Sequence, residues 1–345
     1  MRRKKLPSLG RKIAIACTML AIEASTPAFA QTQTREATAN VTEFPKQILK
    51  TGVVLKSPSM STNTMQLSDS IGLTPVLERI RNLRANLDSN HALTLETVSL
   101  RQELSEQVQA AVLIIQRTDL EIDFTLAEIG AELQVYNEIL NTLINDRDKA
   151  VAYTNAASFI SNGALWAVTE ALAIPSYRNA NFAIPSGIIG IPAGVVPSVA
   201  SMLTLKLVNG KKKTSEANPN MLAKLFGYPT NSEIEYPDSV WHYLHQVPAN
   251  DPTAKPRFDQ IVDRWISDAN MPAFTDRHSK GQLDVITASV ARRKGLSIGT
   301  LTSRQVMLEQ LSAEILKMKR LLLEITMAVQ GDKEMSAAKD VSRLQ

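Results

Sequence analysis

The residues best suited to metal chemistry lie close together between positions 238 and 245. Asp238, His242 and His245 are spaced by four and three residues, so a short helix would place one carboxylate and two imidazoles on one face. Such ligands suit zinc or iron. The favoured alternative is structural: Trp241 and Leu244 pack inward, and the histidines sit at the rim.

Other motifs for catalysis or cofactor binding fail on spacing. Gly210-Lys211 is followed by Lys212 rather than Ser or Thr, and Leu205 stands where a phosphate-binding loop needs glycine. A His-Glu-x-x-His zinc motif is missing from the sequence. We therefore predict no enzyme activity, no catalytic residue and no cofactor. An enzyme, or a metal or ligand binder that uses residues 218–272, is kept as an alternative hypothesis.

The first thirty residues have the three parts of a signal peptide. Six basic residues precede an apolar stretch from Ile13 to Ile22, and Ala28-Phe29-Ala30 supplies a small-x-small cleavage site. The apolar stretch is shorter than the roughly 20 residues that a membrane-spanning helix needs. We expect cleavage after Ala30 and export to the periplasm or cell envelope.

Removal of this segment changes the charge and the chemistry of the chain. Residues 1–30 hold six of the 38 basic residues and one of the 34 acidic residues, so the mature chain is nearly neutral. Nucleic-acid binding loses its main compositional support. Cys17 is the only cysteine, so the mature chain has no thiol for disulfides, metal sites or nucleophilic catalysis.

Long helices with a seven-residue apolar repeat dominate the rest of the chain. The strongest seam has Val108, Ile115, Ile122, Ile129, Tyr136 and Leu143, with companion positions at Val112, Leu126, Leu133 and Leu140. Such a seam favours knobs-into-holes packing. Asp119 interrupts it; a buried polar residue there would fix the register, and the favoured alternative places Asp119 at a wet edge.

A second seam closes the chain. It has Leu301, Leu308, Ile315, Leu322 and Val329, with companions at Leu311, Met318 and Ile325. The two seams predict an all-α fold, an elongated antiparallel bundle or coiled coil, with a central apolar insert rich in Pro and Gly and a short irregular cap region. Pairing within one chain and pairing between copies in a homo-oligomer are both allowed.

The predicted domain boundaries follow these composition changes. They are a signal peptide (1–30), a flexible Ser/Thr-rich tether (31–71), a helical hairpin with the long heptad helix (72–149), an apolar helix-turn-irregular element (150–208), a Pro/aromatic cap region (209–272), returning helices with the C-terminal heptad helix (273–330) and a disordered tail (331–345).

The apolar element is the unusual part. Residues 150–169 and 182–205 contain no charged residue. We expect the first run to continue the long helix, with Gly163, Ala167 and Ala171 as a smooth packing face. Pro185, Pro192 and Pro197 predict an extended or irregular path over 184–196, followed by a short helix from about Ser198.

This element either contacts a membrane or forms a buried core, and the sequence leaves both open. A large exposed apolar patch on a secreted protein needs a partner. The side chains predicted to contact a membrane or protein partner are Phe159, Trp166, Ile184, Ile188, Ile189, Ile191, Val195 and Val196.

The leading functional hypothesis is an exported, non-enzymatic envelope scaffold that docks through residues 150–208. The alternative is a pore-forming or membrane-inserting protein. Export, the absence of cysteine, long helices and a central apolar insert resemble the general layout of helical pore-forming toxins of the haemolysin E type, and this resemblance implies membrane insertion.

Overall fold

The computed structural model describes residues 51–337, which belong to one compact unit, Leu49–Gln345. Within that range the structure does not describe positions 91, 93, 179–180, 182, 209–212, 215–218, 233, 250, 269–270, 272 and 289–293. The predicted signal peptide, residues 31–50 of the tether and residues 338–345 of the tail lie outside the described residues. In chain order the elements are β1 (Ser59–Met60), α2 (Thr62–Ser70), α3 (Thr74–Ser89), α4 (Leu95–Ser176), α5 (Ala183–Val208), β2 (Lys213–Thr214), α6 (Met221–Leu225), α7 (Asp238–His245), α8 (Arg257–Ser267), α9 (Lys280–Ile286), β3 (Lys294–Leu296), α10 (Ile298–Gln330) and β4 (Glu334–Ala337).

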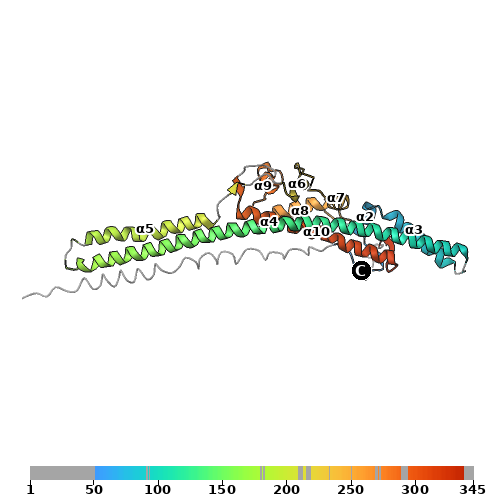
Figure 1. The fold of residues 1–345 in the computed structure, drawn as a ribbon, viewed down its shortest axis with the longest axis horizontal. Helices are drawn as coiled ribbons and strands as arrows, with labels where there is room; N and C mark the ends of the chain where they lie inside the picture. Colours follow the sequence, from blue (N-terminus) through green and yellow to red (C-terminus); the bar gives the residue numbers. More distant parts are fainter. Residues whose placement is uncertain are drawn as a thin grey trace, which may run out of the picture. The chain divides into compact units, whose positions relative to one another are not determined.

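The fold is all-α, as predicted, and α4 is its main element (Figure 1). This helix has 82 residues, which corresponds to about 120 Å at the usual helical rise. A capping box begins it, because the side chains of Thr94 and Thr97 each accept a hydrogen bond from the other's backbone N–H. The first apolar run continues the same helix, which fits its content of alanine, the strongest helix former.

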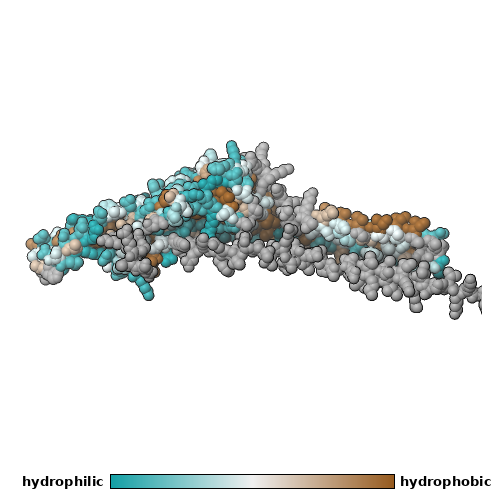
Figure 2. Space-filling model, turned by 180° about the vertical axis from the view of Figure 1, so that it is seen from behind, coloured by the Kyte–Doolittle hydropathy of each residue, from teal (hydrophilic) through white to brown (hydrophobic). Residues whose placement is uncertain are grey.

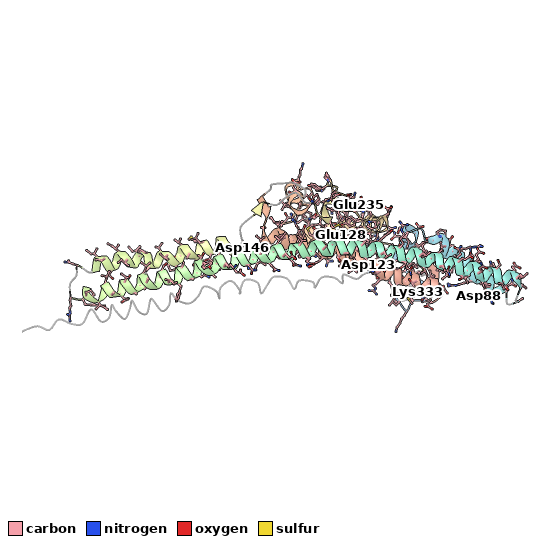
Figure 3. The ribbon with its side chains drawn as sticks, in the orientation of Figure 1. Asp88, Asp123, Glu128, Asp146, Glu235 and Lys333 are labelled. Carbon is pink, nitrogen blue, oxygen red and sulfur yellow. The ribbon has the colours of Figure 1, made fainter. Side chains whose placement is uncertain are left out.

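Helix α10 packs antiparallel to α4 within the chain. Lys319 Nζ lies 2.8 Å from Asp119 Oδ1 and 2.7 Å from Asp123 Oδ1, and further along, Gln305 Nε2 donates to Asn137 Oδ1 at 2.6 Å. Figure 3 labels Asp123 where α4 and α10 lie side by side. The Asp119 side chain is 44% exposed, so it lies at a wet edge, as favoured, and its ion pair with Lys319 links α4 to α10.

Burial follows the seven-residue spacing on both helices, with one shift on α4. All eight named seam and companion residues of α10 are buried, and so are Ile115, Ile122, Ile129, Tyr136 and Leu143 on α4. The companion prediction on α4 is wrong in part: Val112 is 37% exposed, whereas Ala111, Thr118 and Thr125 are buried. A residue three positions after a seam residue and one four positions after it lie on opposite sides of the seam. On α4, the neighbouring elements cover the side that carries the residues three positions after.

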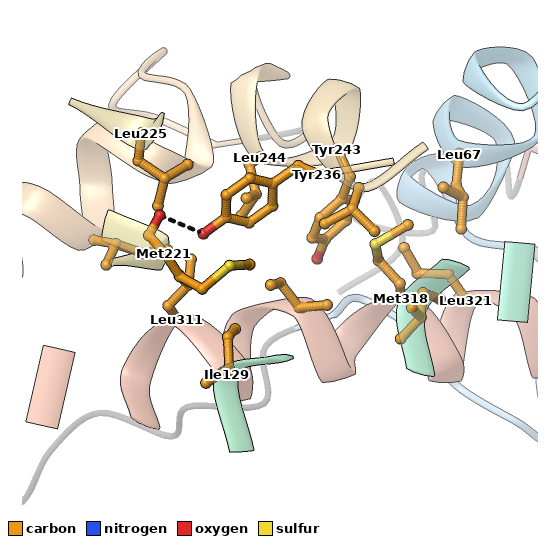
Figure 4. Close-up of a cluster of buried hydrophobic side chains, with 14 of the residues drawn as sticks. Leu67, Ile129, Met221, Leu225, Tyr236, Tyr243, Leu244, Leu311, Met318 and Leu321 are labelled. Atoms are coloured by element: carbon orange, nitrogen blue, oxygen red, sulfur yellow. Dashed lines mark hydrogen bonds between the residues drawn. The ribbon is translucent and has the colours of Figure 1, made fainter. Parts of the chain in front are cut away.

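The core lies where α2, α6, α7 and α8 pack on α4 and α10 (Figure 4). Figure 4 shows Ile129 of α4, Met221 of α6, Leu244 of α7 and Leu311 of α10 converging, and Tyr236 Oη donates to the Met221 carbonyl at 3.0 Å. The ring of Phe226 also contacts the rings of Phe258, Trp265 and Phe274 in edge-on or tilted arrangements, with centroids 5.6 to 6.2 Å apart. The described part of the predicted cap region thus contains helices α6, α7 and α8, and its aromatic residues pack into the core.

The tether prediction is wrong for residues 51–71, and the tail prediction is wrong for 331–337. Strand β1 pairs in parallel with β4, and Met60 and Leu67 are fully buried. Ser61 caps α2, since its hydroxyl accepts the Thr64 N–H. The Ser and Thr residues of this segment cap a helix and form buried hydrogen bonds. A segment rich in Ser and Thr has the same composition whether its hydroxyl groups bond within the protein or are exposed to water, so composition alone predicted a flexible tether.

A buried ion pair joins these two terminal segments to α10. Lys333 Nζ lies 2.6 Å from Glu324 Oε1, and both side chains are 0% exposed. The same ammonium donates to the Val54 carbonyl at 2.8 Å. Ser61 and Thr64 donate to Glu324 Oε2 at 2.7 and 2.5 Å. Every charge in the cluster therefore has a partner, as a buried pair requires.

We expect this cluster to make the fold sensitive to acid. Burial acts to raise the pKa of Glu324, but hydrogen bonds from Lys333, Thr64 and Ser61 outweigh it, so the pKa lies below its ordinary value of 4.5. The unfolded carboxyl binds protons first, so the stabilisation is present above that ordinary value and is lost as the pH falls through the lowered one. Urea unfolding across this acidic range should show a falling free energy of unfolding. Glu324→Gln should flatten that dependence, and an unchanged slope would contradict the assignment.

The prediction of an irregular path over 184–196 is wrong, because α5 is one helix of 26 residues. Pro185 lies in its first turn, where the missing N–H has no helical partner to lose. Pro192 and Pro197 lie inside the helix. An extended apolar segment would leave its backbone groups unpaired, whereas a helix pairs most of them internally, and membrane helices tolerate such prolines.

Candidate functional site: an exposed apolar hairpin

The C-terminal part of α4 and the whole of α5 form an antiparallel pair of helices, here called the hairpin (residues 150–208) (Figure 1). The other described residues are called the body. Tyr177 and Arg178 follow α4 directly and mark the tip of the hairpin. Charged residues continue along α4 as far as the base of the hairpin, where Figure 3 labels Asp146. Lys149 is the last charged residue before the apolar run.

Small and polar residues join the two arms. Ser186 Oγ donates to the Thr169 carbonyl at 3.1 Å, and Thr204 Oγ1 donates to Asn155 Oδ1 at 3.3 Å. Ala193 is buried between the arms. The predicted packing face of Gly163, Ala167 and Ala171 is wrong, because all three residues are exposed.

Large apolar side chains cover the outer surface of the hairpin. Figure 2 shows hydrophobic residues gathered along it, in contrast with the mainly hydrophilic body. Among the described side chains of the hairpin, fourteen are large, apolar and at least 45% exposed: Tyr153, Phe159, Ile160, Trp166, Val168, Ile174, Tyr177, Ile184, Ile188, Ile191, Val195, Val199, Met202 and Leu203. Burying a large apolar side chain fully is worth roughly 1.5–3 kcal/mol. At about half of that for each, the set represents on the order of 10 kcal/mol.

Both arms are long and apolar enough to cross a membrane. Among the described residues, the helical segments Leu95–Pro175 and Ile184–Thr204 contain 18-residue windows with mean hydropathy 1.2 and 1.6. Only 0% and 12% of these windows are buried. The core helix of a soluble protein would be mostly buried, so the exposure of these windows separates them from that class.

Four hydroxyl groups of the arms are hydrogen-bonded to carbonyls of their own helices. Thr154, Ser161, Thr169 and Ser201 each donate to the carbonyl four residues earlier, at 2.8, 2.6, 2.8 and 2.8 Å. Hydroxyls satisfied in this way need no water. These four hydroxyl groups are therefore compatible with an apolar surrounding.

Six of the eight predicted contact residues are exposed on the hairpin: Phe159, Trp166, Ile184, Ile188, Ile191 and Val195. Ile189 and Val196 are only partly exposed. Val199 and Met202 were missed, although they continue the spacing of Ile188, Ile191 and Val195 by three and four residues. This helical spacing indicates that Val199 and Met202 share a face with the predicted contact residues. It was not applied, because the prolines were expected to break the helix.

The three candidate metal ligands lie on α7, as the spacing requires. His242 Nδ1 lies 2.7 Å from the Asp238 carbonyl, and His245 Nδ1 lies 2.9 Å from the Trp241 carbonyl. The His245 ring also stacks on Trp241, with centroids 4.1 Å apart. No group of three or more His, Cys, Asp or Glu side chains in the described part of the chain is arranged to hold a metal ion.

A Gly-x-Ser-x-Gly pattern runs from Gly295 to Gly299. It lies between β3 and α10, the strand-to-helix setting of a nucleophile elbow. Ser297, however, has extended backbone angles and is the N-cap of α10, where its Oγ accepts the Thr300 N–H at 3.2 Å. Helix capping accounts for this serine.

A polar cleft of about 310 Å³ lies between α8 and α10. Its lining includes Arg257, which donates to the Tyr243 and Gln246 carbonyls and to Asn63 Oδ1, each at 3.2 Å. Lys317 pairs there with Glu314 at 2.5 Å. The Arg257 contacts join α8 to α2 and α7, and the Lys317–Glu314 pair lies within α10. Both are structural uses of the charges.

A buried polar cluster surrounds Glu132 in the body. Tyr136 Oη donates to one carboxylate oxygen, and the Met221 N–H donates to the other at 2.9 Å. Asn220 Nδ2 donates to Tyr136 Oη at 3.1 Å. Burial raises the pKa of Glu132, and these bonds together with the charge of Arg304 only partly offset it. The donors and acceptors of the cluster serve one another, so it joins α4 to α6.

Comparison with protein-family models, curated proteins and solved structures finds no match to this chain. The candidate site therefore rests on the geometry of the chain itself. Buried polar groups in the body are mostly occupied in holding helices together. The hairpin is the surface whose composition calls for a partner.

Proposed function

We propose that this protein is an exported, non-enzymatic helical scaffold of the cell envelope that attaches to a lipid bilayer through its hairpin. The observation that carries the proposal is the exposure of fourteen large apolar side chains of the described hairpin residues. The two arms carry no charged residue from Ala150 to Thr169 on α4 or from Ala183 to Leu205 on α5. Transfer of such a surface from water into hydrocarbon is strongly favourable.

The mechanism of such a scaffold is mechanical. Helix α4 passes without interruption from the body into the hairpin, so attachment of the hairpin fixes the orientation of the body as well. The cross-helix contacts of Lys319 and Gln305 with α4 hold α10 to the same rod. The predicted signal peptide supplies the route to the envelope.

Flotation with liposomes tests the attachment. The mature chain, residues 31–345, should float with preformed phospholipid vesicles in a density gradient. Combined replacement of Ile184, Ile188 and Ile191 by serine should reduce partitioning by at least about 100-fold, since each tenfold step corresponds to about 1.4 kcal/mol. These side chains are 69%, 62% and 68% exposed, so the solution fold should tolerate the change.

A matched control uses apolar residues exposed on the body. Val98, Leu120 and Leu316 are 53%, 69% and 45% exposed, and their combined replacement by serine should leave flotation unchanged. Equal losses in both triple variants, or a wild-type chain that remains at the bottom of the gradient, would refute attachment through the hairpin. Vesicles loaded with dye should stay intact, and dye release would favour the pore-forming alternative.

A further inference from the structure

The charge-free length of the first arm matches the thickness of a bilayer. Lys149 and Glu170 flank 20 residues without charge, Ala150–Thr169. A helix of that length rises about 30 Å, and the hydrocarbon core of a bilayer is about 30 Å thick. The arm therefore has the length of a full crossing.

The second arm covers the same height. Ser186 and Gly190 lie level with Thr169, because Ser186 Oγ donates to the Thr169 carbonyl and a Cβ at Gly190 would lie 3.6 Å from Thr169 Cγ2. At the other end, Thr204 lies level with Asn155. Since α5 carries no charge from Ala183 to Leu205, the two charge-free zones lie side by side.

The surface composition of α5 favours crossing over lying flat. A helix that lies in the membrane interface has a strongly charged face opposite its apolar face. Helix α5 has no such face: outward positions carry Ile184, Ile191 and Met202, and Ser186, Ser201 and Thr204 are hydrogen-bonded to protein. A helix that is apolar all round is typical of a membrane span.

Charges mark both ends of the apolar zone. At the base, α4 carries Asp146, Arg147, Asp148 and Lys149 in succession. At the far end stand Glu170 and then Arg178, beside the tip residue Tyr177, which is 88% exposed. Charged groups at the bilayer centre cost several kcal/mol, about 2.5 or more on insertion scales. Both sets are therefore best placed at opposite interfaces.

We propose that the hairpin crosses the entire hydrocarbon core of a phospholipid bilayer as two spans, so that its tip emerges on the face opposite the body. This inference rests on the proposed attachment and goes further, because it makes Tyr177 and Arg178 accessible to a second compartment. The body remains on the side of Lys149, and α4 connects the two sides as a single helix.

Cysteine accessibility tests the crossing. Cys17, in the predicted signal peptide, is the only native cysteine, so the mature chain offers a clean background for the single variants Tyr177→Cys and Thr253→Cys. Each variant is added to preformed phospholipid vesicles and reisolated by flotation. A membrane-impermeant maleimide is supplied either outside the vesicles or enclosed within them.

The expected result is opposite labelling of the two positions. Thr253→Cys, in an exposed loop of the body, should react only with reagent outside, and Tyr177→Cys only with reagent inside. Labelling of a floating Tyr177→Cys variant from outside, or from neither side, would overturn the crossing while leaving attachment intact. Failure of both variants and of the cysteine-free chain to float would overturn attachment and crossing together.

Discussion

Replacement of Lys333 by methionine is expected to lower the free energy of unfolding by about 3–5 kcal/mol, the cost of leaving one member of a buried ion pair unpaired. Glu324 would then keep only its hydrogen bonds from Ser61 and Thr64, in a site where both charged side chains are fully buried. Urea unfolding followed by far-ultraviolet circular dichroism measures the loss. Limited proteolysis should also cut residues 51–61 earlier, because Lys333 holds the Val54 carbonyl.

Two further variants separate the ion pair from a general effect of losing a lysine. The double variant Glu324→Gln with Lys333→Met removes both charges and should recover part of the stability. Lys319→Met breaks a half-exposed pair with Asp119 and Asp123, and should cost no more than about 1 kcal/mol. Equal costs for Lys333→Met and Lys319→Met would contradict the structural role of the buried pair.

The buried pair also illustrates which parts of the fold the sequence leaves open. Ser61 and Thr64 lie in a polar stretch whose composition is that of a tether. Their partner Glu324 lies 260 or more positions away. Hydrogen bonds over such separations leave no periodic trace in the sequence, and only the folded chain brings these residues together.

Seven-residue spacing, in contrast, is a local property, and it predicts the burial of both long helices well. Leu301, Leu308 and Ile315 on α10 are all fully buried. A single sequence does not tell which flank of a seam receives the neighbouring helix. For this reason the companion positions are right on α10 and partly wrong on α4.

For the candidate site, composition predicts the apolar character of the hairpin but not the helical backbone of residues 184–196. Ile184, Ile188 and Ile191 are exposed as expected of contact residues, whereas proline rules for water-soluble helices predicted a break at Pro192 and Pro197. Those rules assume that solvent satisfies the backbone groups freed by the break. An apolar segment packed along α4 gains more by keeping most backbone groups paired within a helix.

The buried flank of α4 lies three residues after the seam positions rather than four, and this difference leads to a quantitative prediction. Ile122 is fully buried and Val112 is 37% exposed, although both belong to the apolar pattern of the sequence. Ile122→Ala should lower the free energy of unfolding by about 2–5 kcal/mol, through lost transfer energy and the cavity left behind. Val112→Ala should cost less than about 1 kcal/mol, because it removes few buried contacts.

Thr125 decides which flank of the seam carries the packing. Its hydroxyl already donates to the Glu121 carbonyl at 3.0 Å, and its side chain is fully buried. Thr125→Val keeps the shape and removes one hydrogen bond, which is worth about 0.5–1.5 kcal/mol, whereas Thr125→Arg should prevent the covering elements from packing. Urea unfolding of the two variants measures the difference. The opposite result would be a Thr125→Arg variant as stable as Thr125→Val, together with a strongly destabilised Val112→Ala. The packed flank of α4 would then be the one that carries Val112, four residues after a seam position, and not the one that carries Thr125.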